Sequence, residues 1–361
     1  MFLEYHQKRT IGFSDGIVTV ALYCTRWCSF HITSNYDWGV MMRDITLLDI
    51  FNAYTRIKDI VRQTPFEEVV TSDQNEEGRI YLKCENRQIT GSFKIRGAVN
   101  KIASLSAVEK SKGVITASSG NHAQGVAYAA QMYRLHAKVI VPISTPINKI
   151  NATKKLGAEV IIAGDTYDHS ELIALDLADR ENMTYIHAFN DPEVIAGQGT
   201  VGLEMMLEQP SLDQIIIPAG GGGLMTGIAI CAKLINPHIR IIGVQSEASA
   251  PWYYAMKAGR VVDVAYEETL ADGLAGKILD ETFQLARQYI DQIVLVKETD
   301  IAEAIRWLMS KKQIVEGSGA VGIAALQIGA APLIGRTGVV LSGGNIDLDK
   351  LQKILNGTNS Q

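Results

Sequence analysis

The sequence has few cysteines and little excess charge of either sign. Only four cysteines occur in 361 residues, at Cys24, Cys28, Cys84 and Cys231, and they are too scattered to form a disulfide framework. Such cysteine usage is typical of a reducing compartment, so we expect a cytoplasmic protein. The net charge of -5 argues against nucleic acid or an anionic membrane as a partner, because either would need a strongly basic surface.

Long membrane-like hydrophobic runs are also missing. Two long uncharged stretches, 214–232 and 317–335, each contain several glycines and one proline, and the first begins with a strand-like run of isoleucines. A membrane-spanning helix needs about 20 consecutive apolar residues in helical form. We therefore expect both stretches to be the buried core of an α/β protein.

Strand-like and helix-like patterns alternate regularly from about residue 44 to residue 355. The strand-like runs lie at 80–84, 113–118, 138–142, 158–164, 215–220, 240–244 and 339–344. Segments between them have apolar residues at helical spacing. Repeated β-α units with short, glycine-containing connections predict parallel sheets covered by helices on both faces. Residues 1–43 lack these patterns and are expected to be a poorly ordered N-terminal extension, and residues 356–361 a short tail.

Lys94 lies between a predicted strand and a predicted helix. The strand-like run 80–84 and the loop Gly91-Ser92-Phe93 precede it, and a helical pattern follows it. A lysine normally carries a solvated charge. In a dry pocket, however, its pKa falls and its amine reacts with carbonyl groups. Lys94 is therefore a candidate imine-forming residue, with Phe93 as its aromatic neighbour.

Four consecutive glycines, Gly220, Gly221, Gly222 and Gly223, join a predicted strand to a helix that begins near Leu224. Backbone N–H groups at such a turn and at the helix N-terminus bind phosphate. A tight turn is the alternative, but it needs fewer glycines. The Lys-Ser/Thr pair of a nucleotide P-loop does not follow, so the pattern predicts a phosphate site of another kind.

A second glycine pattern, at Gly197, Gly199 and Gly202, matches the G-x-G-x-x-G fingerprint of dinucleotide-binding proteins. That fingerprint requires a strand directly before it, and residues 191–196 make a poor strand. We therefore set aside a dinucleotide ligand, and with it a nicotinamide-dependent oxidoreductase.

Polar residues follow two of the predicted strands. Ser118, Ser119, Asn121 and His122 stand before a helix, where they serve either as N-caps or as a clamp for a carboxylate. Ser342 lies at the carboxyl end of a strand, where ligands of open α/β folds bind. An imine-forming lysine, a phosphate site, a carboxylate clamp and a hydroxyl at a sheet edge together suit pyridoxal 5'-phosphate and an amino acid.

The motifs that contain these residues resemble the serine/threonine dehydratase group of fold-type II pyridoxal-phosphate enzymes, which have a tryptophan-synthase-β-like fold. They are KCENRQITGSFKIRGA at 83–98, ASSGNHAQG at 117–125, IAGQGT at 195–200, GGGGL at 220–224 and LSGGN at 341–345. The resemblance covers about Ile45 to Leu355. It implies a homo-oligomer, a dimer or tetramer, with two α/β lobes in each chain. The large lobe is expected over about 44–108 and 188–355, and the small lobe over about 109–187.

The resemblance also implies a role for each candidate residue. Lys94 would form the imine with the cofactor, and Phe93 would pack beside its ring. Asn121 would bond the phenolic oxygen and Ser342 the ring nitrogen. The phosphate would be held by Gly220, Gly221, Gly222, Gly223 and Leu224. The substrate carboxylate would be bound by Ser118, Asn121 and His122, and Ser119 would be an acid/base group on the face opposite Lys94.

We predict that the protein converts L-threonine, and L-serine, to a 2-oxo acid and ammonia by β-elimination of water. A serine at position 342 cannot hold the ring nitrogen protonated, which favours elimination over reactions that need a long-lived carbanion. Alternatives in the same fold are a serine racemase, a threo-3-hydroxyaspartate dehydratase and a β-replacement enzyme. An alternative of another class is a non-catalytic protein that binds the cofactor or an amino acid.

The chain departs from the family pattern in two places. The usual Glu-Pro-Ser-Gly is Glu316-Gly317-Ser318-Gly319 here, and the glycine is expected to loosen that turn. Racemase-like relatives bind a divalent cation beside a Glu whose aspartate partner lies six residues further on. Glu247 would be that Glu, but the later position is Tyr253, so we expect no metal site.

Overall fold

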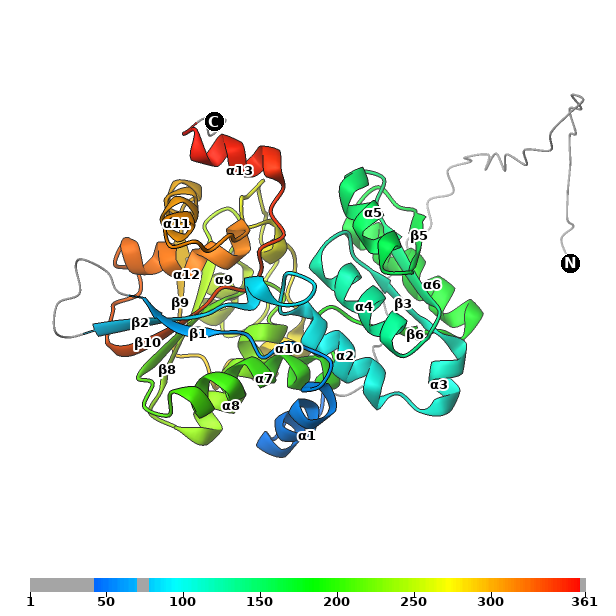
Figure 1. The fold of residues 1–361 in the computed structure, drawn as a ribbon, viewed down its shortest axis with the longest axis horizontal. Helices are drawn as coiled ribbons and strands as arrows, with labels where there is room; N and C mark the ends of the chain where they lie inside the picture. Colours follow the sequence, from blue (N-terminus) through cyan, green and yellow to red (C-terminus); the bar gives the residue numbers. More distant parts are fainter. Residues whose placement is uncertain (1–41, 70–77, 358–361) are drawn as a thin grey trace, which may run out of the picture. The chain divides into compact units, whose positions relative to one another are not determined.

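The structure is a computed structural model that describes residues 42–69 and 78–357. All of these residues belong to one compact unit, Val40–Gln361 (Figure 1). The predicted N-terminal extension therefore lies outside the described residues except at positions 42 and 43. Of the predicted tail, only residues 356 and 357 are described.

Helices and strands alternate along most of the described chain. The α-helices are α1 (Leu47–Ile57), α2 (Lys94–Ser104), α3 (Ala107–Lys112), α4 (Asn121–Met132), α5 (Ile147–Lys155), α6 (Tyr167–Glu181), α7 (Pro192–Glu208), α8 (Gly223–Ile235), α9 (Pro251–Ala258), α10 (Asp280–Ala286), α11 (Glu298–Ser310), α12 (Gly317–Gln327) and α13 (Leu348–Leu355). The strands are β1 (Phe66–Val69), β2 (Gly78–Lys83), β3 (Val114–Ala117), β4 (Ala137–Val141), β5 (Glu159–Ile162), β6 (Thr184–Tyr185), β7 (Gln214–Pro218), β8 (Arg240–Ser246), β9 (Gln292–Val296) and β10 (Gly335–Val340). Two short 3-10 helices, η1 (Glu85–Arg87) and η2 (Asp272–Leu274), lie in loops.

These strands form two sheets. The larger has six strands in the order β1-β2-β10-β7-β8-β9, and the smaller has four in the order β5-β4-β3-β6. Strand β1 pairs with β2 in the antiparallel direction, and the other pairings are parallel. The prediction of an α/β fold with two mostly parallel sheets is confirmed.

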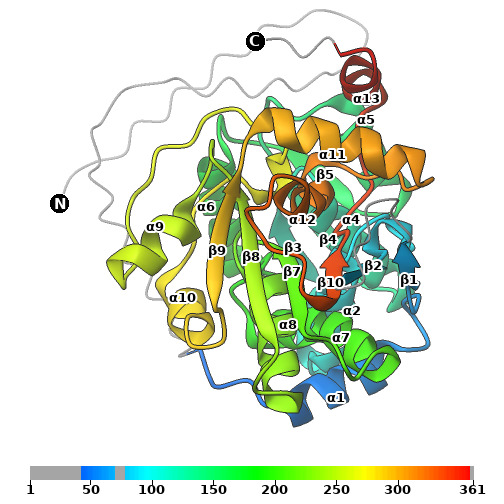
Figure 2. The same ribbon diagram turned by 90° about the vertical axis from the view of Figure 1, so that its left-hand side faces the viewer.

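Helices cover both faces of the larger sheet because its side chains alternate between two cores. In β7, Ile216 packs into the core that α11 and α12 close, whereas Ile215 and Ile217 pack against α7 and α8 (Figure 2). Each isoleucine that is fully removed from water in this way stabilises the fold by about 1.5–3 kcal/mol. None of the described helices is both long and apolar enough to span a membrane.

The smaller sheet is built in the same way. Val139 and Val141 of β4 face a core shared with α4 and α5, and Ile140 faces the opposite core, which α6 closes. In Figure 1, the strands of each sheet are grouped with their own helices. We propose that the small lobe spans about 109–187, because β3 to β6 all lie inside that range.

The segment that carries the G-x-G-x-x-G pattern lies within helix α7, not after a strand. Its glycines let neighbouring backbones approach closely. A Cβ at Gly197 would lie 2.7 Å from the carbonyl oxygen of Arg96, and one at Gly199 would lie 3.0 Å from that of Gly227. These glycines therefore serve helix packing against α2 and α8, and the dinucleotide fingerprint does not apply here.

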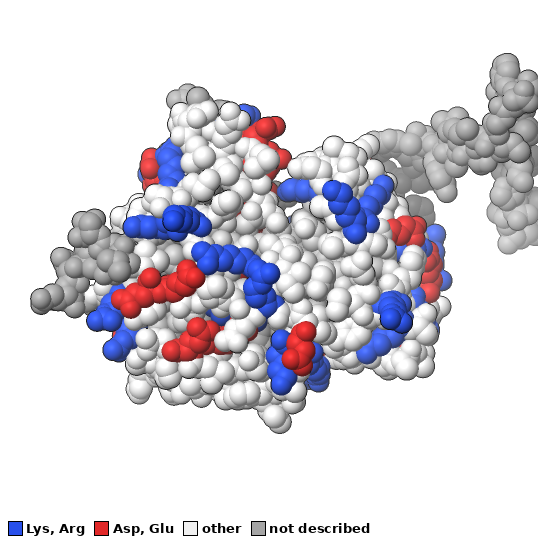
Figure 3. Space-filling model, viewed as in Figure 1, with Lys and Arg blue, Asp and Glu red and all other residues white. Residues whose placement is uncertain are grey.

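Surface charge is mixed on the face that Figure 3 shows. Basic and acidic side chains lie there in small groups, separated by uncharged surface. A nucleic-acid-binding face would instead carry a continuous basic stripe. This face gives no support to such a partner.

Candidate active site

Lys94 is the first residue of α2, and its amine is bonded to a backbone carbonyl. Its Nζ donates a hydrogen bond to the oxygen of Ala188 at 3.0 Å and lies 5.3 Å from the centre of the Phe93 ring. Among the described residues, no carboxylate lies within ion-pair distance of it. The side chain keeps some accessible surface. Even so, burial lowers the pKa of Lys94 to about 8, and the charge of Glu316 opposes this only in part. About a tenth of the amine is then uncharged at pH 7.

The loop before Lys94 is docked on the loop after β10. The Phe93 N–H donates to the carbonyl oxygen of Ser342 at 3.1 Å, and the Gly344 N–H donates to that of Gly91 at 2.8 Å. Gly91 has a positive φ of 73°, and a Cβ there would collide with the side chain of Asn345. The structure thus brings together Lys94 and Ser342, which are far apart in the sequence.

The four glycines join β7 to α8 as predicted and leave backbone donors at the helix start. Gly222 has a positive φ of 102° and no side chain caps α8. The first intrahelical bond runs from the Thr226 N–H to Gly222, so the preceding N–H groups have no acceptor within the helix. A Cβ at Gly221 would collide with the Phe189 ring, and one at Gly222 with Trp252. This backbone cup has the donors that a phosphate needs.

Ser118, Ser119 and Asn121 lie at the start of α4, but none of them caps the helix through its side chain. The N-cap residue is Gly120, whose N–H donates to the Ser118 hydroxyl at 3.2 Å. The simple capping interpretation therefore fails. The uncapped N–H groups of α4 remain suited to an anion, as the carboxylate clamp requires.

His122 is buried, and its ring is already engaged elsewhere. Nε2 lies 3.0 Å from the carbonyl oxygen of Ile186, which fixes it as the donor nitrogen. Burial, and secondarily the charge of Lys94, lower the pKa of His122 to about 3, so the ring is neutral. A neutral ring that donates through Nε2 has only an acceptor at Nδ1. His122 can then help to bind a carboxylate only through its backbone N–H.

Ser342 lies just beyond the end of β10, which begins and ends four residues earlier than the predicted run 339–344. Its buried hydroxyl donates to the carbonyl oxygen of Ser318 at 3.3 Å, and because this bond is long the proton can turn to another acceptor. The hydroxyls of Ser92 and Ser318 are buried too and have no partner in the described part of the chain. Buried hydroxyls without a protein partner suit a polar ligand in this region.

These observations test whether pyridoxal phosphate fits. The site offers an amine of lowered pKa without a carboxylate partner in the described chain, a backbone cup for a phosphate and a hydroxyl where the ring nitrogen is expected. Each part matches one functional group of that cofactor. The residues present therefore fit it.

The sequence model for pyridoxal-phosphate-dependent enzymes matches residues 57–343. The chain belongs to this family. Among the similar members is the L-threonine ammonia-lyase of Thermotoga maritima, which is 44% identical over 314 residues, 86% of this chain and 78% of that protein. The predicted cofactor and the predicted family are confirmed.

Solved structures of other family members have the same fold. Maize serine racemase superposes with a TM-score of 0.82 and 33% identity, covering 87% of this chain and 98% of that chain. Threonine deaminase isoform 2 from Solanum lycopersicum has a TM-score of 0.80 and 36% identity, covering 86% of this chain and 91% of that chain.

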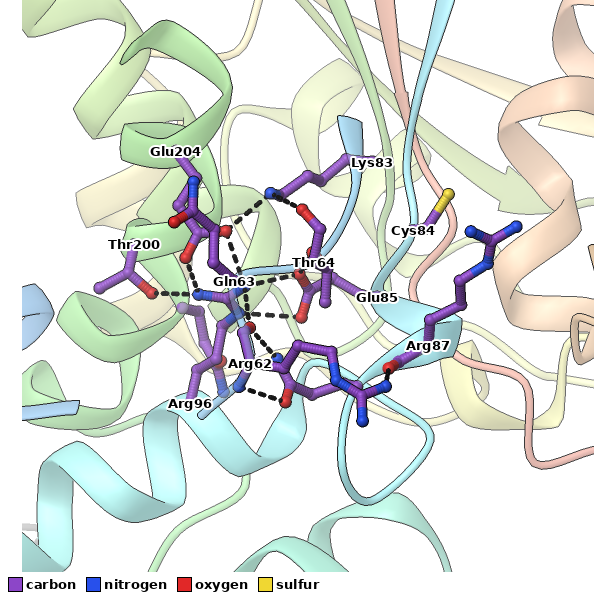
Figure 4. Close-up of polar contacts among 12 residues, drawn as sticks. Arg62, Gln63, Thr64, Lys83, Cys84, Glu85, Arg87, Arg96, Thr200 and Glu204 are labelled. Atoms are coloured by element: carbon purple, nitrogen blue, oxygen red, sulfur yellow. Dashed lines mark hydrogen bonds and ion pairs between the residues drawn. The ribbon is translucent and has the colours of Figure 1, made fainter. Parts of the chain in front are cut away.

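A buried charge cluster anchors the helix that carries Lys94 in this family member (Figure 4). It consists of Lys83, Glu85, Arg96 and Glu204, all with almost no exposed surface. Arg96 pairs with Glu85 at 2.8 Å and with Glu204 at 2.7 Å, and Lys83 pairs with Glu204 at 2.6 Å. Burial alone would lower the pKa of Arg96, but its two carboxylate partners reverse this and raise it. The cluster ties α2 to β2 and α7.

Sequence reasoning missed three features around the site. One is the Ala188 carbonyl oxygen, which accepts a hydrogen bond from Lys94. The other two are the side chains of Glu316 and Asn345, which are both hydrogen-bonded to Asn121. Glu316 stands directly before Gly317-Ser318-Gly319, and Asn345 is the last residue of LSGGN. Neither motif indicates that these side chains bond to Asn121. The predicted loosening at Gly317 is also not found. A Cβ there would collide with the carbonyl group of Leu270, so the glycine permits a close approach of two backbones.

Proposed function

We propose that this protein is a threonine/serine ammonia-lyase that releases a 2-oxo acid and ammonia from L-threonine, and from L-serine, after loss of the β-hydroxyl as water. The observation that carries the proposal is the Lys94 amine, which has no carboxylate partner among residues 42–69 and 78–357 and whose pKa burial lowers to about 8. It occurs in a chain that is 44% identical to an L-threonine ammonia-lyase.

In this proposal, Lys94 both holds the cofactor and moves a proton. Pyridoxal phosphate, when bound, supplies an aldehyde for amines and a ring that withdraws electrons from the substrate Cα. The neutral Lys94 Nζ would be the base that takes the Cα proton of the substrate. The bond to the Ala188 carbonyl restricts the direction in which this amine points.

The remaining residues bind and orient. Gly220 to Leu224 would hold the phosphate through their N–H groups, and Ser342 would face the ring nitrogen through its hydroxyl. Ser118 and the backbone start of α4 would hold the substrate carboxylate. Ser119, in the same loop, would be the second proton-transfer group. These assignments rest on the geometry of the loops and on the resemblance of their motifs.

A racemase is the second candidate, supported by the 33% identity to maize serine racemase. Ser119 would then return a proton to Cα from the face opposite Lys94. Chiral analysis of serine after incubation with the protein separates the two activities. Accumulation of D-serine without a 2-oxo acid would favour the racemase.

The deciding experiment is 2-oxo acid release by the cofactor-loaded protein from L-threonine, L-serine and threo-3-hydroxyaspartate. A Lys94→Ala variant is the control. We expect turnover that depends on Lys94, with L-threonine or L-serine as the best substrate. If the protein binds the cofactor but forms neither a 2-oxo acid nor a racemised amino acid, the remaining interpretation is a non-catalytic binding protein.

The proposal extends to assembly and location. A homo-oligomer, dimer or tetramer, is expected by resemblance and is measured by light scattering of the eluting protein. A cytoplasmic location is expected from cysteine usage. Cys84 and Cys231, the cysteines of the described chain, are buried and free, which is compatible with that expectation.

A further inference from the structure

The side chain amide of Asn121 is held from two sides by residues distant in sequence. Its Nδ2 donates to Oε1 of Glu316 at 2.7 Å, and its Oδ1 accepts from Nδ2 of Asn345 at 2.8 Å. Asn121 begins α4 in the small sheet's half of the chain. Its partners lie at the start of α12 and after β10, against the large sheet.

The chemistry of the partners fixes which way the amide faces. A carboxylate oxygen accepts, so the atom of Asn121 beside Glu316 is the nitrogen. Asn345 also donates to the carbonyl oxygen of Thr90 at 2.8 Å. Its Nδ2 therefore lies between two oxygens, those of Thr90 and Asn121. The Asn121 oxygen then faces Asn345. The second N–H of the Asn121 amide has no acceptor in the described part of the chain, so it is available to a ligand.

Glu316 is rigidly placed. Its N–H donates to the carbonyl oxygen of Gly343 at 3.1 Å, and its carboxylate covers Gly343 so closely that a Cβ there would collide with it. Gly317 packs against Leu270, which fixes the other side of the turn. Only 8% of Glu316 is exposed. A carboxylate buried in this way can direct an amide without competition from water.

Asn345 connects the same amide to Lys94. Through the Thr90 carbonyl it contacts the loop that leads to Lys94, and its side chain fills the space beside Gly91. A shift of Asn345 would therefore move Asn121 and the lysine loop relative to each other. Misplacement of reacting groups by about 1 Å can cost about 100-fold in rate.

We propose that Glu316 and Asn345 are positioning residues, which fix the rotation of the Asn121 amide so that its second N–H is directed at the phenolic oxygen of the cofactor. This inference rests on the cofactor role proposed for Asn121. It adds to that role the two side chains that decide whether Asn121 presents a donor or an acceptor. A purely structural contact between the lobes would instead affect stability alone.

The test compares four variants. Glu316→Ala removes the acceptor, and Glu316→Gln keeps an oxygen that can accept from Asn121. Asn345→Asp replaces the donor by an acceptor, so the Asn121 oxygen faces a carboxylate and loses the hydrogen bond that holds it. Asn148→Ala is the matched control, because Asn148 makes a similar bond to Asp347 at 3.1 Å without touching Asn121.

Each variant is titrated with pyridoxal phosphate, and the visible absorbance of the bound cofactor is recorded from pH 6 to 9. We expect Glu316→Ala and Asn345→Asp to weaken cofactor binding about 10-fold or more. The pH at which the visible band changes should also move, because a lost hydrogen bond to the phenolic oxygen alters its ionisation. Glu316→Gln and Asn148→Ala should stay within about 3-fold of the unmodified protein.

Several outcomes would overturn the inference. One is an unchanged spectrum and affinity in Asn345→Asp, a substitution at an exposed position. Another is an equal effect of Asn148→Ala. If the unmodified protein binds the cofactor but forms no 2-oxo acid, the proposed function fails, whereas the spectral comparison still decides the roles of Glu316 and Asn345.

Discussion

Lys83 ends strand β2 with its amine enclosed by protein and paired to Glu204 at 2.6 Å. Lys94, at the start of α2, turns its amine to the carbonyl oxygen of Ala188 and has no carboxylate partner among the described residues. Burial lowers the pKa of Lys94 to about 8. The fully buried lysine is thus the structural one, and the partly accessible lysine is suited to chemistry. Pairing, more than depth, separates the two environments.

The two environments are also physically connected. Arg96 pairs with Glu85 and Glu204 one helical half-turn after Lys94, so the buried charge cluster fixes the first turn of α2. The cluster holds two cationic and two anionic side chains, and its charges balance. A balanced, hydrogen-bonded cluster can be buried, whereas an unpaired member is costly.

The largest effect should come from removing each lysine in turn. We expect Lys94→Ala to lower 2-oxo acid release by at least about 10³-fold with little change in stability, because the base is lost. Lys83→Met should do the opposite, lowering the free energy of unfolding by about 1–3 kcal/mol while kcat stays within a few-fold. Initial rates and urea unfolding of both variants measure this, and equal loss of activity in both would refute the contrast.

The next effect concerns the arginine of the cluster. Arg96→Met leaves Glu85 without its main partner in the protein interior, so we expect a loss of about 3–5 kcal/mol in the free energy of unfolding. Adding Glu85→Gln to that variant should restore part of it, because the unpaired charge disappears. Urea unfolding at neutral pH measures both variants. A double variant no more stable than the single one would argue against charge as the cause.

The pH dependence of Lys94 can be measured without turnover. Below a pKa of about 8 the amine is protonated and unreactive, and above it the amine is neutral and nucleophilic. Competitive acetylation of the cofactor-free protein, followed by mass spectrometry, should therefore show Lys94 labelling rise with a midpoint near pH 8. A lysine in a model peptide rises near pH 10.4. A midpoint at the peptide value would remove the distinction between the two lysines.

A smaller effect is expected at Glu316, whose charge acts on the pKa of Lys94. Burial first, and then the charge of Asp272, raise the pKa of Glu316 to about 7 from 4.5. Its contribution to stability is therefore complete below pH 4.5 and is lost as the pH rises from 4.5 through 7. The glutamine of Glu316→Gln cannot ionise. Over that pH interval, the free energy of unfolding of this variant should therefore rise relative to that of the unmodified protein by up to about 3 kcal/mol. Thermal unfolding of both cofactor-free proteins between pH 4 and 8.5 measures this. A difference in stability between the variant and the unmodified protein that does not change with pH would contradict the prediction.

The fold could be predicted wherever the signal is local. The alternating apolar runs predicted β2, β3, β4, β5, β7, β8 and the end of β10. The strand-helix junctions indicated Lys94 and the four glycines as candidate site residues. Three strands were missed for different reasons. The two-residue β6 is too short to show a period, and β1 carries exposed Glu67 and Glu68 at the sheet edge. The short apolar run of β9 is equally compatible with a helix.

The missing parts of the site depend on long-range pairing. Asn121 bonds to a partner 195 positions away, Glu316, and to another 224 positions away, Asn345. A single sequence contains no pattern that links such positions. The Ala188 contact of Lys94 uses a backbone carbonyl, which every residue has. Local motifs therefore indicate the candidate reacting residue, and only the fold identifies the residues that hold it.

The close approach at Gly317 has a consequence for protein engineering. Replacing unusual residues by those common in a family is a standard route to greater stability. Here that route would put a proline into the space that the Leu270 carbonyl occupies. Residue 317 and the loop at 270 thus form a matched pair, and the family residue could be introduced only together with a different loop.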